Sequence, residues 1–280
     1  MALPPTSALS QIFITPEAFI STEVPRLAIN LEALDKCGKS HYAFLTTPDP
    51  IVAVTNDPGT LHIVKKAHQA GRRFNGVMQL NYATPDPAVT RTADVDREEW
   101  MAWKKEWARY KSGIYALLNE DPRSPNRTRT LIKDTETDVW TLCMLAHFGK
   151  TVKIEQHMRT EANADYSKVY WDLYKGRPDL NMILIHKLKK QYVKNSKGNS
   201  DWNGEYETSG MNQVGYHVDF TLKAAWDPQY KSFYTEITKP TRYGAGLAGK
   251  RWYGEQSHFG LLALEIFPET ILTPQIWGFR

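Results

Sequence analysis

One short motif constrains the fold of this chain more than any other feature of the sequence. Residues 33–40 have the form A-x-x-x-x-G-K-S, a relaxed phosphate-loop pattern with alanine in place of the usual first glycine. An apolar, strand-like segment at 26–31 precedes the motif, and residues 39–45 can form a helix after it. Backbone N–H groups at the start of such a helix converge on phosphate oxygens. The sequence therefore predicts an α/β protein with a phosphate-binding loop between a strand and a helix.

The motif assigns roles to individual side chains. Lys39 would neutralise the charge of the β- and γ-phosphates, and the hydroxyl of Ser40 would bind Mg²⁺. Asp35 departs from the small residues usual in such loops, because it places a negative charge near the phosphates. An accidental turn before a helix is the alternative interpretation. The residues expected to bind the nucleotide are Ala33, Leu34, Asp35, Lys36, Cys37, Gly38, Lys39, Ser40 and His41.

The rest of the chain alternates between strand-like and helix-like segments. Apolar or β-branched runs predict strands at 51–54, 77–82, 130–132 and 181–185. Periodic or capped segments predict helices at 61–70, 94–121, 138–148 and 162–174. Two later runs, 218–224 and 232–238, are expected to be antiparallel strands joined through Asp227-Pro228. This alternation predicts a three-layer α/β fold with a mostly parallel sheet and antiparallel β additions near the C-terminus.

The predicted helix at 94–121 accounts for part of an unusual aromatic content. The chain has nine tryptophans, and aromatic residues make up 12% of it. Trp100, Trp103, Trp107 and Tyr110 recur at three- and four-residue spacing, which is typical of a helix that faces a core. A platform for stacking nucleobases is the alternative. We expect the core-facing role.

An acidic residue follows the strand-like run at 130–132. Asp134 would stand at the carboxyl edge of the sheet, beside the phosphate loop, where a second contact to Mg²⁺ is needed. We expect it to hold the ion through its hydration shell. A plain helix N-cap is the alternative interpretation. The metal-binding residues predicted from the sequence are therefore Ser40 and Asp134.

Three further polar residues are candidates for catalysis together with Lys39. Asp57 follows a strand-like run and could orient an attacking water, although an Asp-Pro-Gly turn also explains it. Glu136 competes with Asp57 for that role. His186 follows another apolar run and could sense the γ-phosphate, with a purely structural histidine as the alternative.

Lysines concentrate in a polar segment, 187–215, that we expect to form a long loop or hairpin. No acidic residue interrupts them before Asp201. Cations for the backbone and aromatic rings for stacking are what single-strand binding without sequence preference requires. A solvated loop without a partner is the alternative. The residues expected to contact nucleic acid are Lys187, Lys189, Lys190, Lys194, Lys197, Trp202 and Tyr206.

Taken in order, these features resemble the RecA-like P-loop ATPases. The likeness is specific at 33–40, 130–134 and 181–187, and it extends loosely over 26–250. The chain is most similar to the small phage-encoded ATP-binding proteins of the single-strand annealing and recombination type. The resemblance implies ATP and Mg²⁺ as cofactors, and a homo-oligomeric ring or filament with ATP sites between subunits. It also implies that the segment after the strand at 181–185 lines the DNA path.

The resemblance extends to a basic stretch on a late strand. By that likeness, Lys239 and Arg242 would reach the ATP of a neighbouring subunit, whereas ordinary surface cations are the alternative. The predicted domains are an irregular lead-in at 1–25, an ATPase domain at 26–250 and an extension at 251–280 packed on that domain.

The resemblance and the motifs together lead to one function hypothesis and two alternatives. We expect ATP binding and hydrolysis coupled to single-stranded DNA in recombination or replication. A helicase loader or a DNA-translocating motor is one alternative. A nucleotide-binding scaffold with a degenerate phosphate loop is the other, because Leu34, Asp35 and Lys36 replace small residues.

Composition narrows the cellular setting. Only two cysteines occur, so we expect neither a disulfide framework nor a cysteine-based zinc site. No apolar stretch is long enough for a membrane-spanning helix, and the N-terminus lacks the pattern of a secretory signal. The net charge of +4 permits a nucleic-acid partner. We therefore expect a cytoplasmic protein without a membrane partner, in the host cytoplasm if a phage encodes it.

Overall fold

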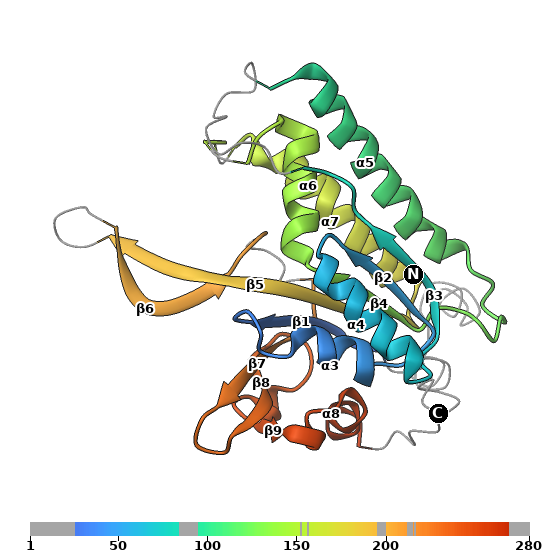
Figure 1. Ribbon diagram of the computed structural model, residues 1–280, viewed down its shortest axis with the longest axis vertical. Coiled ribbons are helices and arrows are strands. Elements are labelled where there is room, and N and C mark those ends of the chain that lie inside the picture. The colour runs from blue at the N-terminus through green and yellow to red at the C-terminus, as the bar shows by residue number, and fades with distance from the viewer. Residues whose placement is uncertain are drawn as a thin grey trace, which may run out of the picture.

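Figure 1 shows the computed structural model of the chain, which describes residues 26–83, 95–151, 153–155, 157–194, 200–211, 215 and 217–268. The lead-in predicted at 1–25 lies outside the described residues, as do Lys197 and the last part of the predicted extension, 269–280. Among the helices that the structure describes, none is long and apolar enough to cross a membrane.

A nine-stranded sheet forms the centre of the molecule (Figure 1). Its strands are β1 (Ala28–Ala33), β2 (Ile51–Thr55), β3 (Phe74–Gln79), β4 (Thr130–Asp134), β5 (Asn181–Lys194), β6 (Ser200–Thr208), β7 (Phe220–Asp227), β8 (Ser232–Pro240) and β9 (Arg251–Tyr253). They follow the order β3-β2-β4-β5-β1-β7-β8-β9, and β6 pairs with β5 outside this path. The pairs from β3 to β7 are parallel, whereas β6, β8 and β9 pair in antiparallel fashion. This order confirms the predicted mostly parallel sheet with antiparallel additions near the C-terminus.

Helices cover both faces of the sheet (Figure 1). One face carries α3 (Lys39–Thr46), α4 (Pro58–Gln69) and α8 (Phe259–Ile266), and the other carries α5 (Arg97–Ala116), α6 (Glu136–Phe148) and α7 (Arg159–Gly176). Successive strand residues point to opposite faces, so that Leu131 of β4 joins the core under α5–α7 and Ile132 joins the core under α3. The two cores confirm the predicted three-layer architecture.

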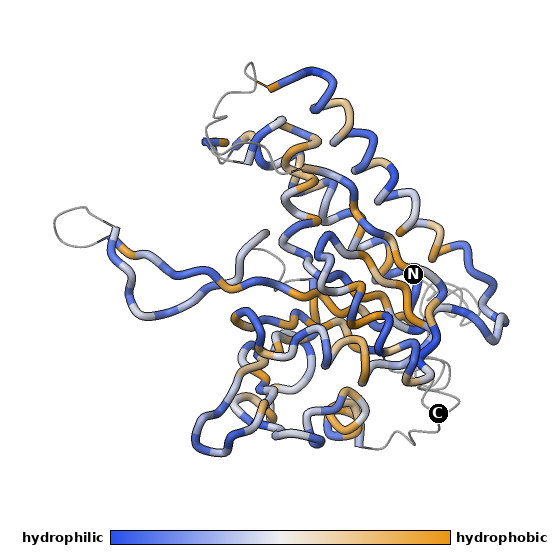
Figure 2. The backbone as a smooth tube through the Cα atoms, viewed as in Figure 1, coloured by the Kyte–Doolittle hydropathy of each residue, from blue (hydrophilic) through white to orange (hydrophobic). Residues whose placement is uncertain are grey.

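Strand β5 consists of two different halves. Its inner half alternates between the two cores, with Leu184 in one and Ile185 in the other, as expected for a parallel strand buried on both faces. Beyond Lys187 the strand leaves the main sheet and pairs with β6 in a hairpin that projects from the body (Figure 1). Figure 2 shows a largely hydrophilic hairpin beside hydrophobic central strands. The loop or hairpin predicted at 187–215 is therefore a hairpin in its described part.

The aromatic stripe of α5 faces the core, as predicted. Trp103, Trp107 and Tyr110 are at most 4% exposed, and the ring of Trp107 stacks on that of Tyr110 with 5.0 Å between centroids. The helix begins after Asp96, whose carboxylate accepts a hydrogen bond from the backbone N–H of Glu98. It ends at Ala116, earlier than predicted, because the next three residues tighten into a 3₁₀ turn.

The strand predicted at 77–82 is shifted in the structure to Phe74–Gln79. Leu80 is 2% exposed although it lies one residue beyond the end of β3, whereas Val77 inside the strand is 37% exposed. Backbone pairing to β2 sets the bounds of β3 at the edge of the sheet. The apolar residues of 77–82 therefore do not mark the bounds of this strand.

Candidate functional site

The loop between β1 and α3 forms one side of a cavity of about 720 Å³. Gly38 caps the helix with a φ of +80°, a left-handed conformation that suits a residue without Cβ. No side chain caps the first turn of α3, so its backbone N–H groups remain available to an anion. Of the predicted nucleotide-binding set, the residues that line the cavity are Asp35, Lys36, Cys37, Gly38, Lys39, Ser40 and His41.

The side chain of Lys39 lies folded against the loop. Its Nζ donates hydrogen bonds to the carbonyl oxygens of Ala33, at 2.8 Å, and Leu34, at 2.9 Å. These two residues do not line the cavity and act through their backbone. Burial lowers the pKa of Lys39, and the nearby charge of Asp35 opposes that shift. The ammonium group is thus held at the loop, with carbonyl partners that phosphate oxygens could replace.

Ser40 and Asp134 meet in the lining of the cavity. The hydroxyl of Ser40 donates a 2.7 Å hydrogen bond to Oδ2 of Asp134, and the hydroxyl of Thr60 donates another of 2.7 Å to the same oxygen. Burial raises the pKa of the Asp134 carboxyl, while the two hydroxyl donors favour its ionised form. Thr60 lies in the first turn of α4, and nothing in the local sequence distinguishes it from an ordinary helix residue.

The donors at this point suit a magnesium ion bound together with a nucleotide. Ser40 and Asp134 offer hydroxyl and carboxylate oxygens, which Mg²⁺ prefers. The part of the chain that the structure describes contains no cluster of three His, Cys, Asp or Glu side chains that could hold a metal. Mg²⁺ usually takes its remaining ligands from phosphate oxygens and water. Ser40 and Asp134 would therefore hold the ion only with phosphate groups beside them.

Asp57 both caps a helix and lines the cavity. It is the N-cap of α4, where its Oδ1 accepts a 2.8 Å hydrogen bond from the backbone N–H of Gly59. It also lines the cavity, close enough to Asp134 for its charge to raise the pKa of that carboxyl. A capped helix thus presents Asp57 to the space above the phosphate loop.

His186 does not reach the cavity, which corrects its predicted role as a phosphate sensor. It is 0% exposed and lies on the same side of β5 as Leu184, against the α5–α7 layer. Its neighbour Lys187 points to the opposite face and lines the cavity. The positive charge of Lys187 contributes to lowering the pKa of Lys39. The residue of β5 that reaches the cavity is therefore Lys187, and the histidine before it is buried on the other face of the sheet.

Glu136 is also placed away from the cavity, and the predicted role in orienting water does not fit this position. It is 0% exposed and lies 3.6 Å from the Nζ of Lys133, which is equally buried. The hydroxyl of Tyr166 donates a hydrogen bond to its Oε1. The Lys133 ammonium group stacks over the ring of Tyr170 at 4.0 Å. Glu136 therefore belongs to a buried polar cluster beneath α7.

Comparisons with known proteins give only distant structural likenesses. No protein-family model matches the sequence, and no curated protein matches it. The RadB recombinase is similar over 90% of this chain and 94% of its own, with 11% identity and a TM-score of 0.42. A KaiC-like protein from the hyperthermophilic archaeon Pyrococcus horikoshii is similar over 82% of this chain and 85% of its own, with 9% identity and a TM-score of 0.44. At this degree of likeness, function has to be argued from the residues of this chain.

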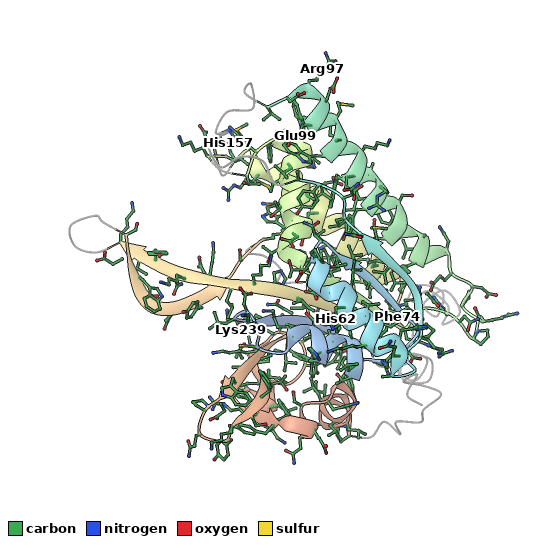
Figure 3. All side chains as sticks on the ribbon, viewed as in Figure 1. His62, Phe74, Arg97, Glu99, His157 and Lys239 are labelled. Carbon is green, nitrogen blue, oxygen red and sulfur yellow. The ribbon has the colours of Figure 1, made fainter. Side chains whose placement is uncertain are left out.

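The two cations of the late basic stretch have different surroundings. Lys239 is exposed near the end of β8 and is labelled in Figure 3. Arg242 is engaged within its own chain: its guanidinium lies 3.2 Å from Oδ1 of Asp219 and 4.5 Å from the ring centroid of Tyr174. The predicted reach of Arg242 into a neighbouring subunit does not fit these contacts. Lys239 remains the candidate for that role.

The projecting hairpin of β5 and β6 has two chemically distinct faces. Strand alternation and cross-strand register place two of the lysines predicted to bind nucleic acid and three aromatic residues on one face, which we call the aromatic face. Its members are Lys190, Tyr192, Lys194, Trp202 and Tyr206. The Nζ of Lys190 lies 4.7 Å from the ring centroid of Trp202, whose ring contacts Tyr206 edge-on at 5.9 Å. Both rings are more than 40% exposed.

The opposite face of the hairpin is polar and carries the acidic residues. There Lys189 pairs with Glu207 at 3.1 Å, and Gln191 accepts a hydrogen bond from the side chain of Asn203. Asp201 and Glu207 alternate with the aromatic face by register. The lysines predicted to bind nucleic acid are therefore divided: Lys189 is neutralised by a partner, whereas Lys190 stands among exposed rings.

The base of the hairpin is joined directly to the cavity region. Thr137, three residues after Asp134, donates a 2.9 Å hydrogen bond to the carbonyl of Ser209 and accepts one of 3.3 Å from the backbone N–H of Lys187. Thr208 donates a 2.7 Å hydrogen bond to Glu32, which lies at the end of β1 before the phosphate loop. The two strands of the hairpin are thus tied to α6, which follows Asp134 and Thr135 at the cavity, and to β1, which precedes the loop at the cavity.

Proposed function

We propose that this protein is an ATPase of the RecA-like P-loop type that binds single-stranded DNA in recombination or replication. The observation that supports it most is the hydrogen bond between Ser40 and Asp134 at the mouth of the phosphate loop. A serine after the loop lysine and a carboxylate from a distant strand are the two groups that P-loop enzymes use for Mg²⁺. Their juxtaposition needs both the motif and the strand order to be right.

The proposal gives a task to five of the side chains that line the cavity. The N–H groups at the start of α3 and the ammonium group of Lys39 bind phosphate oxygens. Ser40 and Asp134 hold Mg²⁺, which supplies charge neutralisation at the β- and γ-phosphates. Asp57 orients the attacking water, and Lys187 contacts the terminal phosphate.

The aromatic face of the hairpin supplies the DNA-binding surface in this proposal. Exposed Trp202 and Tyr206 offer stacking surfaces to unpaired bases, and Lys190 supplies charge for the backbone. Such stacking tolerates any base sequence, because every base has a π-face. Lys187 and Thr137 connect this surface to the cavity, so that binding at one site can be sensed at the other.

Assembly follows from the same proposal. Exposed Lys239 would complete the ATP site of an adjacent copy, which requires a homo-oligomeric ring or filament. The proposed setting is the cytoplasm, where ATP and single-stranded DNA occur together. Phage origin and an annealing activity are the most specific forms of the proposal.

ATP turnover measured with and without single-stranded DNA tests the proposal. The unchanged protein should hydrolyse MgATP, and single-stranded DNA should stimulate it. Lys39→Ala should abolish turnover, whereas Lys65→Ala, which removes an exposed lysine of α4 outside the cavity, should retain it. A strand-displacement assay and an annealing assay then separate a translocating motor from an annealing protein.

Two results would overturn the proposal. ATP binding without turnover would favour a nucleotide-binding scaffold with a degenerate loop. Turnover that is indifferent to single-stranded DNA, together with no salt-dependent DNA binding, would remove the DNA part of the proposal and leave the ATPase part standing.

A further inference from the structure

The cavity extends beyond the phosphate loop to a wall that phosphate groups do not need. This wall is formed by β8 and the segment after β9, and it includes Phe233, Thr235 and Ser257. Leu45 of α3 lines the same cavity. The volume of about 720 Å³ lies in the range of small-molecule sites that bury a whole nucleotide-sized ligand.

Phe233 has the position of a stacking platform. Its side chain is 43% exposed, although it lines a cavity, and its ring lies beside the phosphate loop. A Cβ placed on Gly38 would lie 3.8 Å from Cδ1 of Phe233. The ring of Trp226 contacts it edge-on, with 4.8 Å between the centroids. The aromatic ring is therefore fixed next to the phosphate site with part of its surface uncovered.

Polar groups lie near this ring. The hydroxyls of Thr235 and Ser257 lie 2.9 Å apart, and either can donate to the other. A pair of this kind keeps one donor and several lone pairs free, so it can both donate to and accept from a ligand. Tyr42, which also lines the cavity and is 6% exposed, has a hydroxyl without a partner among the described residues. Burial raises the pKa of this phenol, so it keeps its proton.

We propose that this wall is a nucleobase subsite, in which a purine ring packs on Phe233 and its polar edge meets the hydroxyls of Thr235 and Ser257. This inference rests on the proposed function, because it places the base of the same nucleotide whose phosphates occupy the loop. A two-ring purine covers more of an aromatic platform than a pyrimidine does. Hydroxyls that both donate and accept do not distinguish the edges of adenine and guanine. The subsite therefore selects purine over pyrimidine nucleotides and accepts both ATP and GTP.

Isothermal titration with four magnesium complexes tests the subsite: ATP, GTP, CTP and inorganic tripolyphosphate. Tripolyphosphate contains the phosphate chain without a base, so it reports the loop alone. Phe233→Ala should weaken ATP and GTP about tenfold and leave tripolyphosphate unchanged, since one base–aromatic stack is the interaction lost. Phe233→Leu should behave similarly, because it keeps apolar volume against Gly38 and removes the ring. Tyr230→Ala is the matched control, because Tyr230 lies between β7 and β8, is 64% exposed and is outside the cavity.

The possible outcomes separate this inference from the function on which it rests. Equal weakening of ATP and tripolyphosphate by Phe233→Ala would mean that Phe233 supports the loop and does not bind a base. Unchanged ATP affinity would place the base elsewhere, and CTP binding as tight as ATP binding would remove the purine preference. Absence of binding by all four complexes to the unchanged protein would instead overturn the proposed ATPase function, and the subsite with it.

Discussion

The hydroxyl of Ser40 donates a 2.7 Å hydrogen bond to the carboxylate of Asp134, although 94 positions separate the two residues in the chain. The contact depends on strand order. β1, which leads to Ser40, and β4, which ends in Asp134, are both parallel to β5 and flank it. Parallel strands present their carboxyl ends at one edge of the sheet, so that the two residues face a common cavity.

Replacing Asp134 by asparagine tests this contact. Asp134→Asn keeps the shape and removes the charge, so turnover of MgATP should fall by about 100-fold and the Mg²⁺ dependence of ATP affinity should be lost. Thr60→Val is the matched control, because Thr60 bonds the same oxygen without being a metal ligand in the proposal. Turnover and titration over a range of Mg²⁺ concentrations measure both effects. Unchanged Mg²⁺ dependence in Asp134→Asn would remove Asp134 from the metal site.

The strand, loop and helix that carry the A-x-x-x-x-G-K-S motif could be predicted because all of their determinants are local. The glycine, lysine and serine occur in a fixed spacing, and the flanking segments form the expected strand and helix. Thr60 could not be predicted, because its role arises only when α4 is packed beside β4. Glu136 could not be excluded by sequence either, since a carboxylate near Asp134 can face either side of the sheet.

The wrong prediction that His186 reaches the cavity, where the structure places Lys187, has a different cause. The inner half of β5 is apolar at every position from Met182 to Ile185, so the sequence carries no polar alternation that would show which face each residue takes. Only the packing of the whole fold decides which face of the sheet each of these residues takes. From the sequence alone, the histidine at the end of the run and the lysine after it are equally good candidates for the face at the cavity. In the hairpin beyond Lys187, by contrast, rings and acids alternate, although a cluster of lysines conceals the pattern.

A pair of adjacent lysines tests the two faces of the hairpin. Lys190→Ala removes a cation from the aromatic face, and it should weaken single-stranded DNA binding several-fold and reduce the slope of log K against log salt by about 0.7. Lys189→Ala is the matched control on the other face, where Glu207 already neutralises the charge. Fluorescence anisotropy at several salt concentrations gives both quantities. Equal effects of the two substitutions would contradict an assignment to one face.

The aromatic rings provide an independent test of the same face. Trp202→Ala should weaken single-stranded DNA binding about tenfold and leave the salt slope unchanged, since stacking releases no counterions. Trp171→Ala is the control, because it removes another partly exposed indole that lies on α7 and not on the hairpin. A change of slope in Trp202→Ala would mean that the ring acts by positioning a lysine. Loss of binding in both variants would point to general instability.

The buried pair of Lys133 and Glu136 should contribute to stability and not to nucleotide binding. Lys133→Met leaves the Glu136 carboxylate buried without its cation, which should lower the free energy of unfolding by about 3 kcal/mol. Adding Glu136→Gln should recover part of that loss, because the remaining groups are neutral. Urea unfolding of the single and double variants gives the coupling. ATP affinity should be unchanged in folded protein, and a large change would connect this cluster to the cavity.

His186 should make the protein less stable in acid. Burial lowers its pKa from 6.5 to about 4, and the positive charge of Lys133 acts in the same direction. The unfolded chain therefore binds a proton at this histidine below pH 6.5, whereas the folded protein binds it only below about pH 4. The contribution of the neutral histidine to stability is complete above pH 6.5 and is lost as the pH falls through 4. Between pH 7.5 and 5 the loss should be about 2 kcal/mol. His186→Gln removes this titration. Urea unfolding at both pH values should therefore show that the free energy of unfolding falls by about 2 kcal/mol less in the variant than in the unchanged protein. His217 is present in both proteins, so its titration contributes equally to both. If the free energy of unfolding depends on pH identically in the two proteins, His186 takes up its proton in the folded protein as readily as in the unfolded chain. Its burial beneath the α5–α7 layer would then require a partner for that charge.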